Sequence, residues 1–264
     1  MIPPILRSFD LDLDSGFLNL TFNEVISASS FIASFVSFTN SSNTVMDITL
    51  TESAVLNGNG LNIDVTLFMD DLNTLKSHPV VGKSRQSTYL FFEEGAFADV
   101  SGNNITALTE AVRVNRLIRD ARPPALSEFN VDIAGRTIEL IFDEIVNAEE
   151  FSATSLTLIN STQSPPASSF FRLTTSSTVT SANGTTVTIA IGNEDFNFLS
   201  DILDLATDDD NTFLLLDGSA LTDLAGNPII AIRVPDPFPV TSFSPDSEPP
   251  FLREYSLDLS LIHI

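Results

Sequence analysis

The chain contains no cysteine, and only two of its 264 residues are histidine. Without cysteine there can be no disulfides, no thiolate catalysis and no cysteine-based zinc site. The absence of cysteine does not indicate whether the protein lies inside or outside the cell. His78 and His263 are too few to suggest a histidine-based metal or acid–base centre, and no Gly-x-Ser-x-Gly motif is present. We therefore predict no catalytic residues and no cofactor.

Basic residues are also scarce. Only 12 Lys and Arg stand against 35 Asp and Glu, which gives a formal net charge of −23 at pH 7. Phosphate backbones and anionic membranes repel such a chain, so we expect neither nucleic acid nor membrane insertion. No apolar run approaches the roughly 18 residues of a transmembrane helix. The carboxylates have two interpretations, a solvated acidic surface or binding of hard cations such as Ca²⁺.

The chain repeats itself at the distance of a whole domain. Pro3–Leu13 returns as Pro123–Ile133, 120 positions later (123 − 3), and starts again at Pro249–Leu259. This period is too long for a solenoid repeat of roughly 20 to 50 residues. We predict two domains, residues 1–121 and 122–246, and a truncated third repeat at 247–264. We interpret 259–264 as a non-native tail and expect the chain to begin inside a longer protein.

The pattern of apolar and polar residues in each repeat predicts an all-β sandwich. Residues 9–13 alternate apolar and acidic side chains, as in a half-buried strand. The turn Ser15–Gly16, matched by Ala134–Gly135, then leads to a second strand and indicates a β-hairpin. Further alternating segments give about seven strands per repeat. We expect one short helix per repeat, at 70–76 and 194–200, and last strands near 105–114 and 229–234.

Two short motifs recur in the same order in both repeats. A strand ends in Phe22–Ile26 and Phe142–Val146, and an Asp-x-x-Gly-Asn turn follows at Asp99–Asn103 and Asp223–Asn227. In these motifs the chain resembles the bacterial Ig-like domains of the S-layer (SbsA-like) type, which occur as tandem repeats in large surface or secreted proteins. The resemblance covers nearly all of each repeat. It implies two tandem Ig-like β-sandwich domains that act as a spacer without catalysis; the helix leaves the strand order open.

The Asp-x-x-Gly-Asn turns provide the first candidate sites. Asp and Asn can cap such a turn through their own side chains, and Gly permits a positive φ. This structural explanation needs no metal. The alternative is that Asp99 and Asp223 are Ca²⁺ ligands.

Glu24 and Glu144 occupy equivalent positions at the ends of the second strands. Each could bond to nearby backbone or to an arginine of the linker. The alternative is a carboxylate at the domain junction that helps to bind Ca²⁺. Arg119 and Arg122 in the linker speak against that alternative because they would repel a cation.

Five Asn-x-Ser/Thr triplets could accept glycans in a secreted eukaryotic protein. The chain is rich in Asn, Ser and Thr, so chance is the alternative explanation. The two triplets at equivalent strand ends are the strongest pair, and the first triplet, inside a predicted strand, is weaker. The acceptor residues are Asn19, Asn40, Asn104, Asn160 and Asn183.

Three functions are compatible with these observations. The leading one is a structural or adhesive spacer at the cell surface or outside the cell, whose first partners are neighbouring repeats of the same chain. The second is a module that binds carbohydrate or surface proteins, although the lack of Trp and the two Tyr weaken it. The third is an accessory region of a secreted enzyme.

Overall fold

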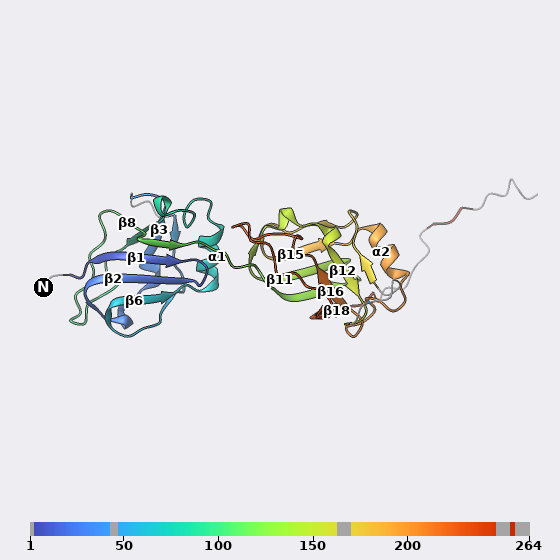
Figure 1. The fold of residues 1–264 in the computed structure, drawn as a ribbon, viewed down its shortest axis with the longest axis horizontal. Helices are drawn as coiled ribbons and strands as arrows, with labels where there is room; N and C mark the ends of the chain where they lie inside the picture. Colours follow the sequence, from blue (N-terminus) through green and yellow to red (C-terminus); the bar gives the residue numbers. More distant parts are fainter. Residues whose placement is uncertain (1–2, 43–46, 163–169, 247–253, 257–264) are drawn as a thin grey trace, which may run out of the picture.

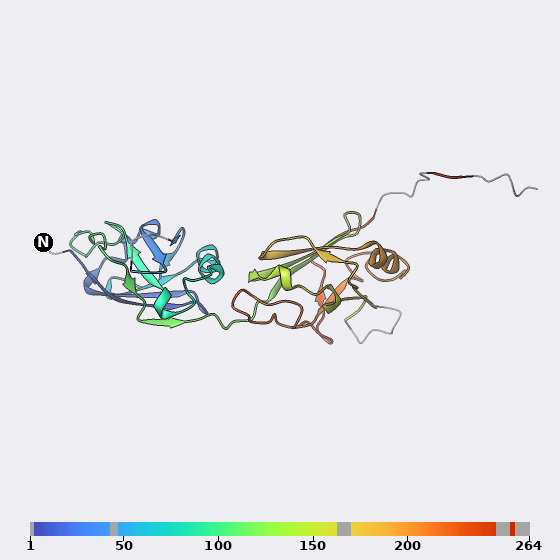
Figure 2. The same cartoon turned by 90° about the horizontal axis from the view of Figure 1, so that it is seen from above.

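The computed structural model describes residues 3–42, 47–162, 170–246 and 254–256. These residues form mostly β-structure, with four sheets and two short α-helices. Figures 1 and 2 show two lobes that lie end to end along the longest axis. We call them unit 1 and unit 2. Most of the expected third repeat and all of 259–264 lie outside the described residues.

Unit 1 contains nine strands and one α-helix within the described residues. The expected helix at 70–76 is confirmed as α1. The elements are β1 Leu6–Asp12, β2 Phe17–Ile26, β3 Val36–Thr39, β4 Ile48–Thr49, β5 Ala54–Val55, β6 Gly60–Thr66, α1 Met69–Ser77, β7 Tyr89–Phe92, β8 Val112–Arg113 and β9 Arg116–Ile118.

Unit 2 repeats this series, again with nine strands and one α-helix among the described residues. The expected helix at 194–200 is confirmed as α2. The elements are β10 Leu126–Asp132, β11 Thr137–Val146, β12 Leu156–Ile159, β13 Phe170–Arg172, β14 Thr178–Val179, β15 Gly184–Ala190, α2 Asn193–Ser200, β16 Phe213–Leu216, β17 Phe238–Pro239 and β18 Ser242–Ser244.

The two units have the same sheet topology. In unit 1 the orders are β5-β6-β2-β1-β9 and β4-β3-β7-β8, and in unit 2 they are β14-β15-β11-β10-β18 and β13-β12-β16-β17. Neighbouring strands are antiparallel except for β1 with β9 and β10 with β18, which are parallel. Because the first and last strands of a unit run in the same direction, the chain enters at one end of the unit and leaves at the other.

The expected last strands are confirmed only in part. In unit 1 the two-residue strand β8 lies inside the expected range 105–114, but the rest of that range is loop and β9 follows it. In unit 2 the expected range 229–234 contains no strand among the described residues, and the closing strands are β17 and β18. The apolar signal arises because Ile105 and Ile229 are buried as loop residues. Two-residue strands such as β4 and β5 account for most of the difference between the nine strands found and the smaller number expected.

The predicted hairpins are confirmed, but their turns differ. Antiparallel β1 and β2 are joined through Gly16, whose φ is +74°. At the equivalent position of unit 2 the residue with positive φ is Arg136, at +54°, and not Gly135. The Arg136 guanidinium lies 4.0 Å from the centre of the Phe196 ring, and this contact offsets part of the backbone strain.

Each unit packs its two sheets around its own apolar core. In unit 1, Phe9 of one sheet meets Phe38 of the other with ring centroids 6.2 Å apart, and Phe22 stacks on Phe92. The buried residues of the two units form two separate clusters. Each unit is therefore sandwich-like and closes its interior without side chains from the other.

Both helices carry a buried aspartate that the sequence analysis treats only as a helix-start residue. Asp71 is 3 % exposed and Asp195 is 0 % exposed. The Asp195 carboxylate accepts hydrogen bonds from Thr174 N at 3.0 Å, Thr174 Oγ1 at 2.7 Å and Ser177 Oγ at 2.6 Å. Asp71 accepts equivalent bonds from the loop before β5. These carboxylates fasten the preceding loop to the helix.

Asp195→Asn should lower the free energy of unfolding of unit 2 by about 2–3 kcal/mol, because an amide nitrogen would face buried donors that now reach a charged acceptor. Urea denaturation measures this loss. Glu194→Gln, on the exposed neighbour in the same helix, is the control and should change stability little. Equal effects of the two substitutions would contradict the anchoring role.

Candidate functional site at the joint between the two units

Helix α1 lies at the end of unit 1 that faces unit 2 (Figure 1). Leu72 and Leu75 bury one side of the helix in the core of unit 1. Lys76 follows directly, in the last turn, and extends toward unit 2. Its side chain is only 8 % exposed. The helix thus delivers a cation into a buried position between the units.

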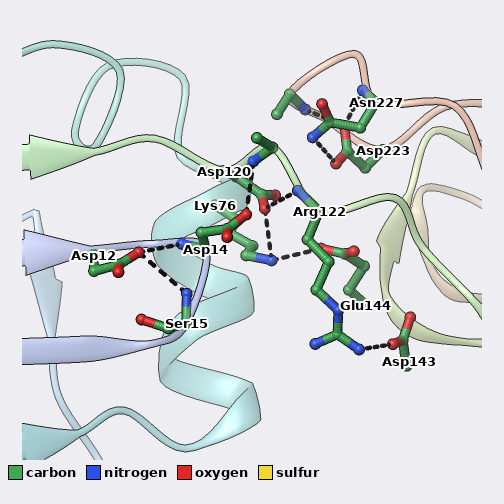
Figure 3. Close-up of polar contacts among 12 residues, drawn as sticks. Asp12, Asp14, Ser15, Lys76, Asp120, Arg122, Asp143, Glu144, Asp223 and Asn227 are labelled. Atoms are coloured by element: carbon green, nitrogen blue, oxygen red, sulfur yellow. Dashed lines mark hydrogen bonds and ion pairs between the residues drawn. The ribbon is translucent and has the colours of Figure 1, made fainter.

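The Lys76 ammonium bridges the linker and unit 2. Its Nζ lies 2.6 Å from Glu144 Oε2 and 3.1 Å from Asp120 Oδ1. Figure 3 shows both contacts. Both carboxylate side chains are almost fully buried as well. Buried, charge-assisted bonds of this kind are stronger and more directional than ion pairs in water.

Strand alternation explains why Glu144 is buried. Phe142, Glu144 and Val146 share one face of β11, and all three are buried. Glu24 has the same phase in β2 but is only half-buried. Within the described residues, no helix like α1 packs on that end of unit 1, which lies near the N-terminus in Figure 1.

The two Asp-x-x-Gly-Asn turns have the same internal hydrogen bonds. Asp99 Oδ1 accepts from Ser101 N and Asn103 N, both at 2.8 Å, and Oδ2 accepts from Asn103 Nδ2 at 2.6 Å. Asp223 accepts the equivalent bonds from Ala225 and Asn227. The hydrogen bonds from Asn103 hold the pKa of Asp99 below its usual range. Both aspartates therefore cap their turns.

Among the described residues, the turn of unit 2 belongs to a group of three carboxylates that lie close together, and the turn of unit 1 belongs to no such group. Asp120, Glu144 and Asp223 each place one carboxylate oxygen within 4.8 Å of the others. Figure 3 shows Asp223 above the Glu144 carboxylate and opposite Asp120. Glu144 Oε1 is buried and has no hydrogen-bond partner among the described residues. We call these three residues the joint carboxylates.

The joint carboxylates carry more negative charge than one ammonium neutralises. Burial raises the pKa of Glu144 and of Asp120, and the charge of Asp223 raises both further, against the opposing effect of Lys76. Burial also acts to lower the pKa of Lys76, but hydrogen bonds to Glu144 and the charges of Glu144 and Asp120 outweigh it. The pKa of Lys76 is therefore raised. Lys76 is held as a cation.

Lys76 and Lys83 are the only lysines of the chain, and both lie at the joint. Lys83 Nζ donates to the Lys76 carbonyl at 2.7 Å. Burial lowers the pKa of Lys83, although Asp223 and Asp120 oppose the shift. With Arg119, the two lysines line an open cavity of about 520 Å³ between the units.

The linker is fastened to both units by backbone and side-chain bonds. Ala121 N donates to Asp14 Oδ1 of unit 1 at 3.1 Å, and Ala125 N donates to Asp143 Oδ1 of unit 2 at 2.8 Å. Arg122 forms an ion pair with Asp143. The Pro124 carbonyl accepts from Ile230 N at 3.0 Å. The segment therefore has little freedom to act as a hinge.

Two of the joint carboxylates, Glu144 and Asp223, are candidates in the sequence, whereas Asp120 and the role of Lys76 are not. The expected contact of Glu144 with a linker arginine is not found: Glu144 pairs with Lys76, and Arg122 pairs with Asp143, the neighbour of Glu144. The missed signal is the break in the repeat at the helix end, where Lys76 has Ser200 as its equivalent.

The glycan acceptors differ in accessibility. Three are exposed, and two have their side-chain nitrogen bonded: Asn19 to Asp64 and Asn160 to Asp204. Their use as acceptors stays a prediction. The exposed three are Asn40, Asn104 and Asn183.

No protein-family model matches the chain, and no curated protein matches its sequence. Two solved structures are similar in part: the S-layer protein SbsC (residues 31–844) and the N-terminal part of SbsC. Each is 16 % identical with a TM-score of 0.30, over 70 % and 73 % of this chain. This chain spans 25 % and 45 % of their lengths. A likeness this weak supports no assignment of function.

Among the described residues, no helix combines the length and apolar character needed to cross a bilayer.

The Lys76 contacts should depend on pH in the alkaline range. The pKa of Lys76 is higher in the folded chain than its ordinary value of 10.5. The stabilisation is therefore fully present below that value and is lost as pH rises through the folded-state pKa. Melting temperatures from about pH 8 to about pH 12 measure the loss. Lys76→Met should show a weaker decline than the unchanged protein, and parallel curves would contradict the assignment.

Proposed function

We propose that this chain is a non-catalytic structural spacer of a cell-surface or secreted multi-domain protein. In this proposal residues 1–121 and 122–246 are tandem Ig-like β-sandwich domains. The observation that supports the proposal most is the joint, where Lys76 of unit 1 is buried against Asp120 of the linker and Glu144 of unit 2. A spacer needs a defined angle between its modules, and a buried ion pair with bonded neighbours defines one.

The strand topology also favours a spacer. Parallel β1 and β9 place the entry and exit of unit 1 at opposite ends, and β10 and β18 do the same in unit 2. Successive units then extend in line, as Figures 1 and 2 show. The linker, fastened on both sides, adds stiffness at the point where a chain of domains would otherwise bend.

The acidic surface fits an extended module. A formal charge of −23 keeps such chains apart in solution by repulsion. The first partner in this proposal is the neighbouring unit of the same chain. Surface proteins or glycans would be partners of other parts of the parent protein.

Small-angle scattering should show an elongated particle, and labels on the two units should give a narrow distance distribution. The chain has no cysteine, so cysteines introduced at the exposed positions Gln86 and Asp209 would carry the only labels. Double electron–electron resonance then measures the distribution of distances between the two spin labels. A compact particle, or a broad distribution in the unchanged joint, would contradict the spacer.

Glu144→Gln should broaden this distribution because it weakens the charge-assisted bond to Lys76. Glu24→Gln is the matched control, since Glu24 is the equivalent residue at the end of unit 1 away from the joint. Its distribution should equal that of the unchanged protein.

A further inference from the structure

We propose that the end of unit 1 that faces away from unit 2 is a docking surface, and that its partner is a unit whose exit end carries a lysine at the position of Lys76. The inference rests on the proposed spacer and names the chemistry by which its units join. We call this surface the entry end of unit 1 and define it by five residues: Ile5, Glu24, Val25, Asp99 and Val100.

The entry end of unit 1 has the same framework as the entry end of unit 2, on which unit 1 sits. In both units the Asp-x-x-Gly-Asn turn pairs with the end of the second strand. The pairs are Asp99 with Ile26 and Asp223 with Val146. Glu24 therefore stands beside its turn in the same register as Glu144 does beside the turn of unit 2, where Glu144 accepts the Lys76 ammonium.

The entry of the chain is fixed in the same way in both units. Ala125 N donates to Asp143 Oδ1 at 2.8 Å in unit 2, and Ile5 N donates to Asn23 Oδ1 at 2.6 Å in unit 1. Unit 1 thus keeps the backbone arrangement of an occupied entry end although no unit sits on it among the described residues (Figure 1).

Three apolar side chains at the entry end of unit 1 are open to solvent. Ile5 is 45 % exposed, Val25 is 40 % exposed and Val100 is 58 % exposed. Val100 N donates to the Val25 carbonyl at 3.3 Å, so these two residues lie side by side. Apolar groups gathered in this way mark a surface that gains free energy when a partner covers it.

The equivalent positions of unit 2 are partly covered. Leu224, the counterpart of Val100, lines the cavity at the joint together with Lys76. All three counterparts are less exposed than the residues of unit 1, and they are Ala125, Ile145 and Leu224. A unit placed before unit 1 would cover Ile5, Val25 and Val100 in the same way.

Charge decides which kind of partner fits. Glu24 is half-buried, and among the described residues its carboxylate forms no ion pair and no side-chain hydrogen bond. Its counterpart Glu144 has the Lys76 ammonium at 2.6 Å. An ammonium delivered by a partner would give Glu24 the charge-assisted bond that Glu144 already has. The surface therefore selects an exit end that carries a lysine.

The exit end of unit 2 does not meet this requirement. Ser200 stands at the position of Lys76, and the acidic residues Asp201 and Asp204 follow it. Like charges placed across an interface oppose association. Copies of this chain should therefore not join head to tail, and the fitting partner is a unit with the exit end of unit 1.

A chain in which residues 3–122 occur twice in succession tests the proposal. Each unit encloses its own core, so the inserted unit should fold. Its linker leads directly into Pro3 of the second copy and brings Lys76 of the first copy to Glu24 of the second. Gln86→Cys in both copies supplies the only two spin labels. The distribution of distances between them should be as narrow as the distribution across the joint with unit 2.

Substitutions identify the contact. Glu24→Gln in the second copy should broaden the distribution, and Lys76→Met in the first copy should do the same. The two together should broaden it no further than either alone, because both remove one contact. Glu144→Gln is the matched control, since it acts on the other joint and should leave this distribution unchanged.

A second variant tests the apolar part of the surface. Val100→Asp in the second copy should also broaden the distribution, and the exposure of this side chain means that the fold should be kept. In the chain without the inserted unit, Val100→Asp should leave the distribution between labels on units 1 and 2 unchanged.

A broad distribution in the chain with the inserted unit would overturn the docking surface. So would a narrow distribution that neither Glu24→Gln nor Lys76→Met changes. Head-to-tail association of the unchanged chain in ultracentrifugation would overturn the requirement for a lysine. The joint with unit 2 separates the two proposals: if it is narrow while the new joint is broad, only the docking surface fails, whereas a broad distribution at the joint with unit 2 removes the spacer.

Discussion

A buried ammonium needs acceptors on every side that water has left, and the carboxylate partners of Lys76 lie in the linker and in unit 2. That requirement fixes where unit 2 and the linker must lie relative to α1. Desolvation of the charges offsets much of the Coulomb gain, so such a contact adds more to the choice of geometry than to stability. A unit rotated away from this position would leave a charge buried without a partner.

The two units have the same topology but different ends. Their sheet orders are identical, and each encloses its own core. The cores differ in size of side chain, because Phe38 and Phe92 of unit 1 have Leu158 and Leu216 as equivalents. The charged ends differ too. Glu144 is buried against α1 of the preceding unit, whereas its equivalent Glu24 is half-buried.

Much of the local structure could be predicted because it depends on neighbours in sequence. Alternation at Phe9, Leu11 and Leu13 gives the first strand, and acidic residues before apolar ones give both helices. The closing strands could not be located, since burial of Ile105 as a loop residue produces the same apolar signal as a strand. The parallel pairing of β1 and β9 joins residues about a hundred positions apart and leaves no local mark.

The candidate site was predictable only in part for the same reason. The repeat marks Glu144 and Asp223 because each has an acidic counterpart in unit 1, Glu24 and Asp99 respectively. Lys76 is marked only by the break in the repeat opposite Ser200, and the importance of Asp120 and Lys76 arises from the contact between two folded units. The sequence likewise marks Asp71 and Asp195 only as residues at the start of a helix, although their buried hydrogen bonds hold the loops in place.

The parallel pairing of first and last strands has a mechanical consequence. Tension applied to the two ends of unit 1 pulls β1 and β9 in opposite directions along their shared edge, where Asp10, Leu11 and Asp12 face Arg116, Leu117 and Ile118. The load then falls on all the backbone hydrogen bonds of that edge together, in shear. Antiparallel neighbours pulled from one end would open one bond at a time, like a zip. The topology that makes the chain extend in line also makes each unit resist being drawn out.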